Sequence, residues 1–238
     1  DSLFARRESL LHMRALMRTV APDALWVNPP WISEADGYKP VQLRTALRAG
    51  FRVPDTLFTN DPDAVAEFFK AHDGRIVYKS FRGKNWMDGD KLADLRAVNR
   101  TAMVERSDLD YRTEIAAAPG IYQQVIDKAY ELRVTAMGHS FLAARLHSQD
   151  QDHTQLDWRS GSQDVTIEPY TLPSDIEALC RRYMELAGLR FGCFDFIVTP
   201  DNDFVFVEVN QMGQFLWVED RCPDIPLLQT FCDFLISA

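Results

Sequence analysis

The spacing of apolar residues divides the chain into predicted helices and strands. The opening segment has helical spacing, at Leu10, Leu11, Met13, Leu16 and Met17. A second helix is predicted at 40–49, because Gly50 follows it where a left-handed cap would end a helix. A third begins at Asp61-Pro62, an N-cap followed by a first-turn proline, and should stop before Gly74.

Apolar runs bounded by turn residues predict the strands. They lie at 75–79, 121–126, 131–137, 141–146, 191–198 and 204–210, and the last two flank a turn at 199–203 and form a predicted hairpin. Between them, Ser174 and Glu177 have capping-box spacing and start a helix that ends at Gly188. Helices and strands of this kind predict an α+β fold.

Composition and charge exclude several classes of protein. With 238 residues and 46% hydrophobic residues, the chain is long and apolar enough to form a packed core. It has no long apolar run and no signal-like start, so we expect no membrane insertion. The net charge of −9 argues against nucleic-acid binding. The cysteines form no CxxC pair, which predicts buried free thiols in a reducing cytoplasm, at Cys180, Cys193, Cys222 and Cys232.

The predicted hairpin carries a candidate metal site. Alternation along a strand places Glu208 and Asn210 on one face, with Val207 and Val209 on the other. Antiparallel pairing across the turn brings Asp195 near Glu208. Three hard oxygen donors of this type suit Mg²⁺, which completes its octahedron with phosphate oxygens and water.

The alternative for these polar residues is a solvated sheet face, the usual place for a single Asp or Glu. A solvated face would show polar residues at several alternate positions. The two strands are otherwise largely apolar, so Asp195, Glu208 and Asn210 stand out as exceptions. A buried carboxylate needs a compensating partner, and a metal ion is one.

Two lysines could hold phosphate groups. Lys79 ends a predicted strand and is followed by a polar segment, 80–90, that predicts a mobile loop. Lys39 precedes a predicted helix. Lysines at such positions are more often solvated than functional, so neither is strong evidence alone.

A basic pocket is also predicted. Glu131 and Arg133 share one strand face, and Arg145 and Arg159 follow in the sequence. Together they could bind phosphate or an anionic substrate. Surface ion pairs with the many acidic residues explain these arginines equally well.

The order of these elements resembles the ATP-grasp superfamily. The resemblance is carried by Asp195, Glu208-Val-Asn210, Lys79, Gln123-Gln-Val-Ile-Asp-Lys128 and Glu131-Leu-Arg133, and it spans roughly residues 26–238. Further segments look like the ATP-grasp maturases of graspetides such as microviridins: Trp26-Val-Asn28, Lys39-Pro-Val-Gln-Leu43, Val53–Pro62, Tyr130–Val134, Asp157-Trp-Arg159 and Gly213-Gln-Phe-Leu-Trp217. Asn210-Gln-Met-Gly213 departs from the pattern, because it lacks the proline common after the asparagine.

The resemblance implies a role for each matching residue. Lys39 and Lys79 would hold the phosphates of ATP. The segment Gln123, Gln124, Val125 and Ile126 would bind the nucleotide, with adenine on the backbone of the last two and the ribose on Glu131. Asp195, Glu208 and Asn210 would hold Mg²⁺. Arg145, Lys79 and Arg133 would be catalytic, and Asp157, Arg159 and Arg133 would bind the substrate.

The resemblance also implies an architecture. ATP would lie between two α+β lobes of an ATP-grasp fold. The chain would divide into a remainder of the N-terminal lobe at 1–50, a central lobe at 51–122 and a C-terminal lobe with the Mg²⁺ site at 123–238. The N-terminal lobe is expected to be truncated or partly absent.

The implied function is that of a peptide macrocyclase. A cytoplasmic enzyme of this group would phosphorylate Asp or Glu side chains of a ribosomal precursor peptide, which has a leader and an acidic core. It would then join them to Ser, Thr or Lys side chains, and a homodimer is the habit of the family. Two alternatives stay open: another ATP-grasp carboxylate-amine ligase, and a nucleotide-binding module without catalysis.

Overall fold

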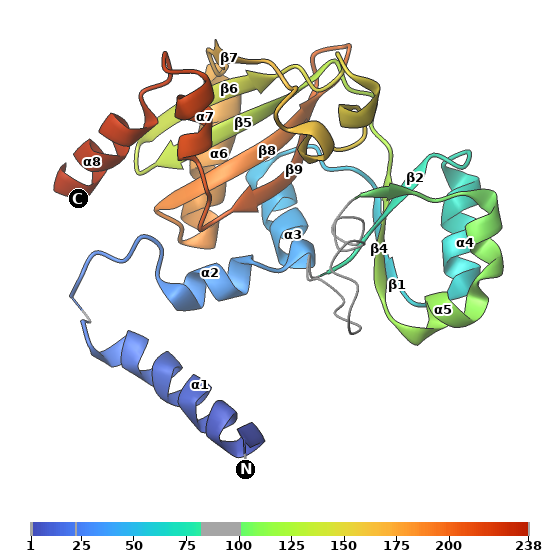
Figure 1. Cartoon of the computed structure of the whole chain (residues 1–238), viewed down its shortest axis with the longest axis horizontal. Helices are drawn as coiled ribbons and strands as arrows, with labels where there is room; N and C mark the ends of the chain where they lie inside the picture. Colours follow the sequence, from blue (N-terminus) through green and yellow to red (C-terminus); the bar gives the residue numbers. More distant parts are fainter. Residues whose placement is uncertain (1, 22, 82–100, 238) are drawn as a thin grey trace.

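The computed structural model describes residues 2–21, 23–81 and 101–237. The loop predicted at 80–90 falls largely outside the described residues. The described residues form two antiparallel sheets, and Figure 1 shows each sheet with its own helices beside it. The α+β prediction is confirmed.

The larger sheet has five strands. Their bounds are β5 (Tyr130–Met137), β6 (Ser140–Leu146), β7 (Ile167–Tyr170), β8 (Phe191–Val198) and β9 (Phe204–Asn210). They lie in the order β7-β6-β5-β8-β9, so β9 is an edge strand. The predicted hairpin 191–210 is confirmed in this sheet, and the predicted strands 131–137 and 141–146 pair with each other.

One face of this sheet packs on two helices, α3 (Lys39–Ala49) and α6 (Ser174–Ala187). Alternate strand residues such as Leu132, Phe194 and Phe206 fill the core between the layers. Both helices end at glycines with positive φ, 104° at Gly50 and 70° at Gly188, as their sequences predict.

The predicted capping box of α6 is wrong. Pro173 occupies the N-cap, and no side-chain cap hydrogen bond forms there. Ser174 is already the first helical residue, so its hydroxyl is one position too late to cap the first turn.

The smaller sheet has four strands among the described residues. They are β1 (Thr56–Thr59), β2 (Ile76–Lys79), β3 (Ala102–Met103) and β4 (Gly120–Gln124), in the order β1-β4-β2-β3. It packs on α4 (Pro62–Ala71) and α5 (Arg112–Ala117), with η1 (Arg106–Asp110) between β3 and α5 in the sequence. Asp61 caps α4 as predicted, because its carboxylate accepts a hydrogen bond from the Asp63 N–H at 2.9 Å.

Four further helices of the described ranges lie outside the two main helix layers. They are α1 (Ser2–Thr19), α2 (Pro30–Asp36), α7 (Leu216–Arg221) and α8 (Leu227–Ser237). α1 buries none of its side chains and projects from the rest of the chain in Figure 1. α7 and α8 cover one end of the sheet face opposite α3 and α6. Two short 3₁₀ turns, η2 (Asp152–Thr154) and η3 (Trp158–Gly161), precede β7.

The pairing of β8 with β9 is irregular at one point. Asp195 pairs with Glu208, but the next residue, Phe196, pairs with Phe206, so Val207 is an extra residue in β9. Val207 therefore lines the same cleft as Glu131 and does not join Val209 in the core. The expectation that Val207 and Val209 share a face is wrong, because strict alternation fails at a bulge.

All four cysteines are free, as predicted. Cys180, Cys193 and Cys222 are buried, but Cys232 on α8 is exposed, which corrects the expectation that every thiol is buried. Among the described residues, no helix is long and apolar enough to cross a membrane. The division into 1–50, 51–122 and 123–238 stays a prediction.

Candidate active site

The sheet face opposite α3 and α6 carries a row of polar residues. Arg133 on β5 pairs with Asp195 on β8, and Asp195 pairs with Glu208 on β9. Directly paired residues of antiparallel strands point to the same face, so three adjacent strands present these side chains together. Asn210 extends the row along β9.

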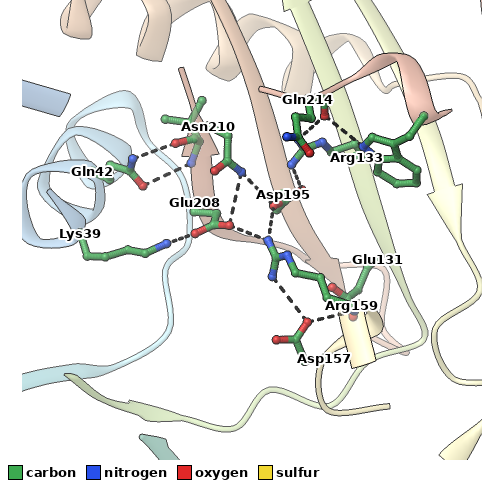
Figure 2. A network of polar contacts seen from close by, with 12 residues as sticks. Lys39, Gln42, Glu131, Arg133, Asp157, Arg159, Asp195, Glu208, Asn210 and Gln214 are labelled. Atoms are coloured by element: carbon green, nitrogen blue, oxygen red, sulfur yellow. Dashed lines mark hydrogen bonds and ion pairs between the residues drawn. The ribbon is translucent and has the colours of Figure 1, made fainter. Parts of the chain in front are cut away.

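Short polar contacts connect this row (Figure 2). Arg133 Nη1 donates to Asp195 Oδ1 at 2.7 Å, and Arg159 Nη2 donates to Asp195 Oδ2 at 3.2 Å. The same Arg159 nitrogen lies 2.7 Å from Glu208 Oε1, and the Lys39 ammonium contacts the other Glu208 oxygen. Asn210 Nδ2 lies 3.4 Å from Asp195 Oδ2 and 3.3 Å from Glu208 Oε1. The three predicted metal ligands therefore meet at one point.

The donor set fits Mg²⁺. Two carboxylates and one amide converge, and the Asn210 amide presents its oxygen to the same place if its oxygen and nitrogen are exchanged. Within the described ranges, no group of three or more His, Cys, Asp or Glu side chains forms a metal site. Mg²⁺ prefers a few protein oxygens as ligands, and phosphate oxygens and water complete its coordination shell.

Cations surround this point. Burial lowers the pKa of Lys39 to about 7, and the positive charges of Lys79 and Arg159 act in the same direction. Burial also lowers the pKa of Lys79 to about 8, with Lys128 as the next contribution. These cations repel one another, so an anion such as polyphosphate would be bound favourably among them.

A narrow cleft next to the row is lined by residues from both sheets. Gln123, Gln124, Val125 and Ile126 form one wall with Lys79, and Glu131, Ile197 and Val207 form another. The Lys79 ammonium donates to Gln123 Oε1 at 2.6 Å. The predicted nucleotide segment and the predicted phosphate lysine therefore lie in one cleft. The Val125 N–H already donates to the Arg75 carbonyl at 2.9 Å.

Lys128 also lines this cleft, and the resemblance implies no role for it. Its ammonium donates to Glu131 Oε1 at 2.7 Å and to the Leu156 carbonyl at 2.9 Å. Burial raises the pKa of Glu131, and the neighbouring Lys128 charge opposes that shift. Its place three residues before Glu131 was the available signal.

A second and larger cavity, about 950 Å³, adjoins the row of Asp195, Glu208 and Asn210, which we call the metal row after its predicted role. Asn210 and Arg133 line this cavity, and Arg159 lines both this cavity and the cleft. Its aromatic wall includes Trp158 and Trp217, whose rings stack with centroids 5.0 Å apart. The Arg133 side chain is only 6% exposed, and its Nε has no hydrogen-bond partner among the described residues.

Asp157 holds Arg159 in place. Its Oδ1 accepts a hydrogen bond from the Arg159 N–H at 3.1 Å and lies 3.5 Å from Arg159 Nη1. The Arg159 guanidinium carbon is 5.3 Å from the centre of the Trp158 ring. The Asp-Trp-Arg segment therefore acts as one local unit that presents a guanidinium to the metal row.

Arg145 is the one predicted site residue that the structure does not bring to this place. It pairs across the strands with Leu132, whose side chain lies in the core on the opposite sheet face. Its guanidinium lies over the Tyr130 ring at 3.9 Å and 3.3 Å from Glu168. Alternation along β6 is the reason, because Arg145 is one residue out of phase with the side chains that face the site.

The sequence matches no protein-family model and no curated protein. Solved structures do match. The macrocyclase MdnC from Microcystis aeruginosa MRC, bound with its precursor peptide MdnA, is 29% identical with a TM-score of 0.83, and the match covers 100% of this chain and 73% of that one. The macrocyclase MdnB from the same organism is 28% identical with a TM-score of 0.78, over 100% and 72% of the two chains.

A third match supports the fold alone. A RiPP-associated ATP-grasp ligase from Chryseobacterium gregarium, in complex with ADP and a leader and core peptide, has a TM-score of 0.86 at 24% identity. That match covers 100% of this chain and 71% of the other.

The two-sheet fold, with a row of carboxylates and cations beside a cleft between the sheets, defines an ATP-grasp ligase. Within that class, the chain resembles the graspetide-type maturases that modify ribosomally made peptides.

Proposed function

We propose that this ligase uses ATP and Mg²⁺ to activate Asp or Glu side chains of a ribosomal precursor peptide and to close macrocyclic esters or amides. One observation carries the proposal: Arg159, which contacts both carboxylates of the metal row, lines both the cleft and the larger cavity. The cleft has the residues that a nucleotide needs, and the larger cavity has two arginines for a carboxylate.

The cleft would hold ATP. Lys39 and Lys79 carry compact ammonium groups whose lowered pKa values reflect burial and mutual repulsion, and phosphate oxygens would relieve both. Glu131 is a buried acceptor and would bind the ribose hydroxyls. The segment 123–126 would contact adenine, with Val207 and Ile197 as apolar cover from the larger sheet.

The metal row would hold Mg²⁺. Asp195, Glu208 and Asn210 would be its protein ligands. Arg159 and Lys39, which contact the same carboxylates, would then face the phosphate oxygens and the carboxylate of the substrate. The bound metal would supply charge stabilisation for the transferring phosphoryl group.

The larger cavity would hold the acidic core of the peptide. A guanidinium binds a carboxylate through two parallel N–H donors, and Arg133 lines this cavity. Arg159 borders the same cavity. The tryptophan wall would pack against the peptide backbone and exclude water from the reacting carboxylate.

The reaction balances in two steps. A carboxylate oxygen of the peptide attacks the γ-phosphorus of ATP and displaces ADP, which gives an acyl phosphate. A hydroxyl or amine of the same peptide then attacks the acyl carbon, loses its proton and displaces phosphate. Each ring therefore removes one water from the peptide, and the lysines and arginines offset the negative charge that gathers in the first step.

The leader would dock away from this chemistry. A separate groove of about 350 Å³ lies on the smaller sheet, between β2, β3 and the helical segment 106–117. Met103 and Tyr111 line it and are 39% and 59% exposed, so it presents apolar surface in the part of the chain that the structure describes. Asp108 and Glu114 also line it and favour a partner with both apolar and basic residues.

A cytoplasmic location and a homodimer complete the proposal. The free thiols and the need for ATP support the location. Light scattering of the purified protein measures the oligomeric state directly.

The proposal is tested with candidate precursor peptides, ATP and Mg²⁺. Release of ADP should depend on the peptide and should be abolished in Glu208→Gln, which keeps the side-chain volume and removes one charged ligand. A near-normal rate in that variant would rule out Glu208 as a metal ligand.

A further inference from the structure

The strand that carries two of the metal ligands is an edge strand, and a side chain from a helix borders part of its open edge. In the part of the chain that the structure describes, β9 has a neighbouring strand, β8, on one side only. Along the other side, Arg52 forms a bridge with Val205, and its carbonyl accepts a hydrogen bond from the Phe206 N–H at 2.9 Å. Farther along, Gln42 of α3 contacts the backbone of Val209.

The Gln42 amide bonds both polar groups of that residue. Gln42 Nε2 donates to the Val209 carbonyl at 2.8 Å, and Gln42 Oε1 accepts from the Val209 N–H at 3.3 Å. The side chain is buried, with Gln42 only 4% exposed. A primary amide can replace a strand here because it offers one donor and one acceptor side by side, as a peptide group does.

The two groups that Gln42 holds belong to different peptide planes. The Val209 N–H belongs to the plane that joins Glu208 to Val209, and the Val209 carbonyl belongs to the plane that joins Val209 to Asn210. Each plane ends at the Cα of one proposed metal ligand. Gln42 therefore fixes the backbone on both sides of Val209, and with it the relative orientation of Glu208 and Asn210.

The same helix supplies a phosphate lysine. Lys39 is the first residue of α3 and lies three residues, about one helical turn, before Gln42. Its ammonium contacts Glu208, so α3 meets β9 through one charged contact and one amide contact, both visible in Figure 2.

We infer that Gln42 is a positioning residue that fixes α3 against β9, so that the Lys39 ammonium and the Glu208–Asn210 ligand pair keep one separation. This inference rests on the proposed ATP and Mg²⁺ site. It goes beyond that site because Gln42 touches neither the nucleotide cleft nor the larger cavity, and acts only through the backbone of its neighbours.

A residue that only stabilised the fold would behave differently. Its loss would lower the unfolding temperature and leave the Mg²⁺ requirement of ATP binding unchanged. A positioning residue changes both, because the ligands no longer meet at the right separation even in the folded protein.

The first variant is Gln42→Leu, which keeps a similar volume and cannot bond Val209. Its matched control is Leu43→Ala, at the next residue of the same helix, whose buried side chain contributes to the core but makes no contact of this kind. ATP binding is measured by calorimetry over a series of Mg²⁺ concentrations, at a temperature well below both unfolding transitions. We expect Gln42→Leu to need at least tenfold more Mg²⁺ for half-maximal ATP binding, and Leu43→Ala to need the wild-type amount.

A second variant, Gln42→Glu, tests the hydrogen-bond pattern itself. A protonated carboxyl can donate to the Val209 carbonyl and accept from its N–H, as the amide does, but the ionised form cannot donate. The charged groups of α3 and β9 that face this contact are Lys39 and Glu208, with Arg159 also on Glu208, and the other charged residues of α3, Arg44 and Arg48, are exposed. Compared with wild type at each pH, Gln42→Glu should approach normal Mg²⁺ dependence as the pH falls from 8 to 6, and Gln42→Leu should show no such recovery.

The outcomes separate the two claims. If wild type binds no ATP in the presence of Mg²⁺, the proposed function fails. If wild type binds ATP and both Gln42 variants keep its Mg²⁺ dependence, Gln42 has only a structural role and the inference is overturned. If Gln42→Leu does not fold, the pH dependence of Gln42→Glu decides in the same way.

Discussion

The buried pair of Arg133 and Asp195 allows a quantitative prediction. The two side chains are 6% and 8% exposed and meet at 2.7 Å. Arg133→Leu removes the cation and leaves a buried carboxylate whose other contacts are Arg159 at 3.2 Å and Asn210 at 3.4 Å. Both remaining contacts are longer than the one that is lost.

Removal of one partner from a buried ion pair typically costs about 3–5 kcal/mol. Arg159 still neutralises part of the Asp195 charge, so we expect the lower end, about 3 kcal/mol of unfolding free energy. For a chain of this size, that corresponds to a fall in Tm of about 6–12 °C.

Urea unfolding of wild type, Arg133→Leu and Asp195→Leu, together with the double variant, measures this cost. The double variant should be more stable than the sum of the two single losses predicts, because it leaves no unpaired charge. Mg²⁺ should stabilise Arg133→Leu more than it stabilises Asp195→Leu, which lacks a ligand. A loss below about 1 kcal/mol in Arg133→Leu, or strictly additive losses, would refute the assignment of a buried and coupled pair.

Three further predictions concern individual side chains. ATP affinity of wild type should decline as the pH rises from 7 to above 8, because the two ammonium groups that bind phosphate, Lys39 and Lys79, have pKa values lowered to about 7 and about 8 and lose their protons there. In Lys79→Arg, calorimetry should show the decline near pH 7 without the further decline near pH 8, and a profile identical to that of wild type would exclude Lys79 as a source. Arg159→Ala should raise the KM for the precursor peptide by about 10-fold or more, the loss of one charge-assisted contact, and steady-state kinetics that show an unchanged KM would remove Arg159 from the peptide site. Arg145→Gln should leave ATP binding unchanged, because that side chain faces away from the cleft, and a large loss measured by calorimetry would restore it to the site.

Sequence periodicity predicts this fold well where the pattern is local. The hairpin 191–210 follows from two β-rich runs around a turn, and α6 follows from an apolar stripe that ends at Gly188. Each prediction depends on residues that are neighbours in the sequence, so no long-range information is needed.

The site is predicted less completely, because it depends on contacts between distant segments. The bulge at Val207 cannot be deduced from alternation, since a bulge is a departure from it. The face of Arg145 depends on the register between β5 and β6, and a shift of one residue would reverse it. Lys128 and Gln42 were missed because their roles come from partners that the fold supplies, such as the Val209 backbone 167 residues away.

The most direct test of the account is the mass of candidate precursor peptides after incubation with the protein, ATP and Mg²⁺. We expect the loss of one water per ring, dependent on ATP and absent with Glu208→Gln. Release of ADP without that loss of mass would contradict macrocyclisation and would indicate a ligase with a different acceptor.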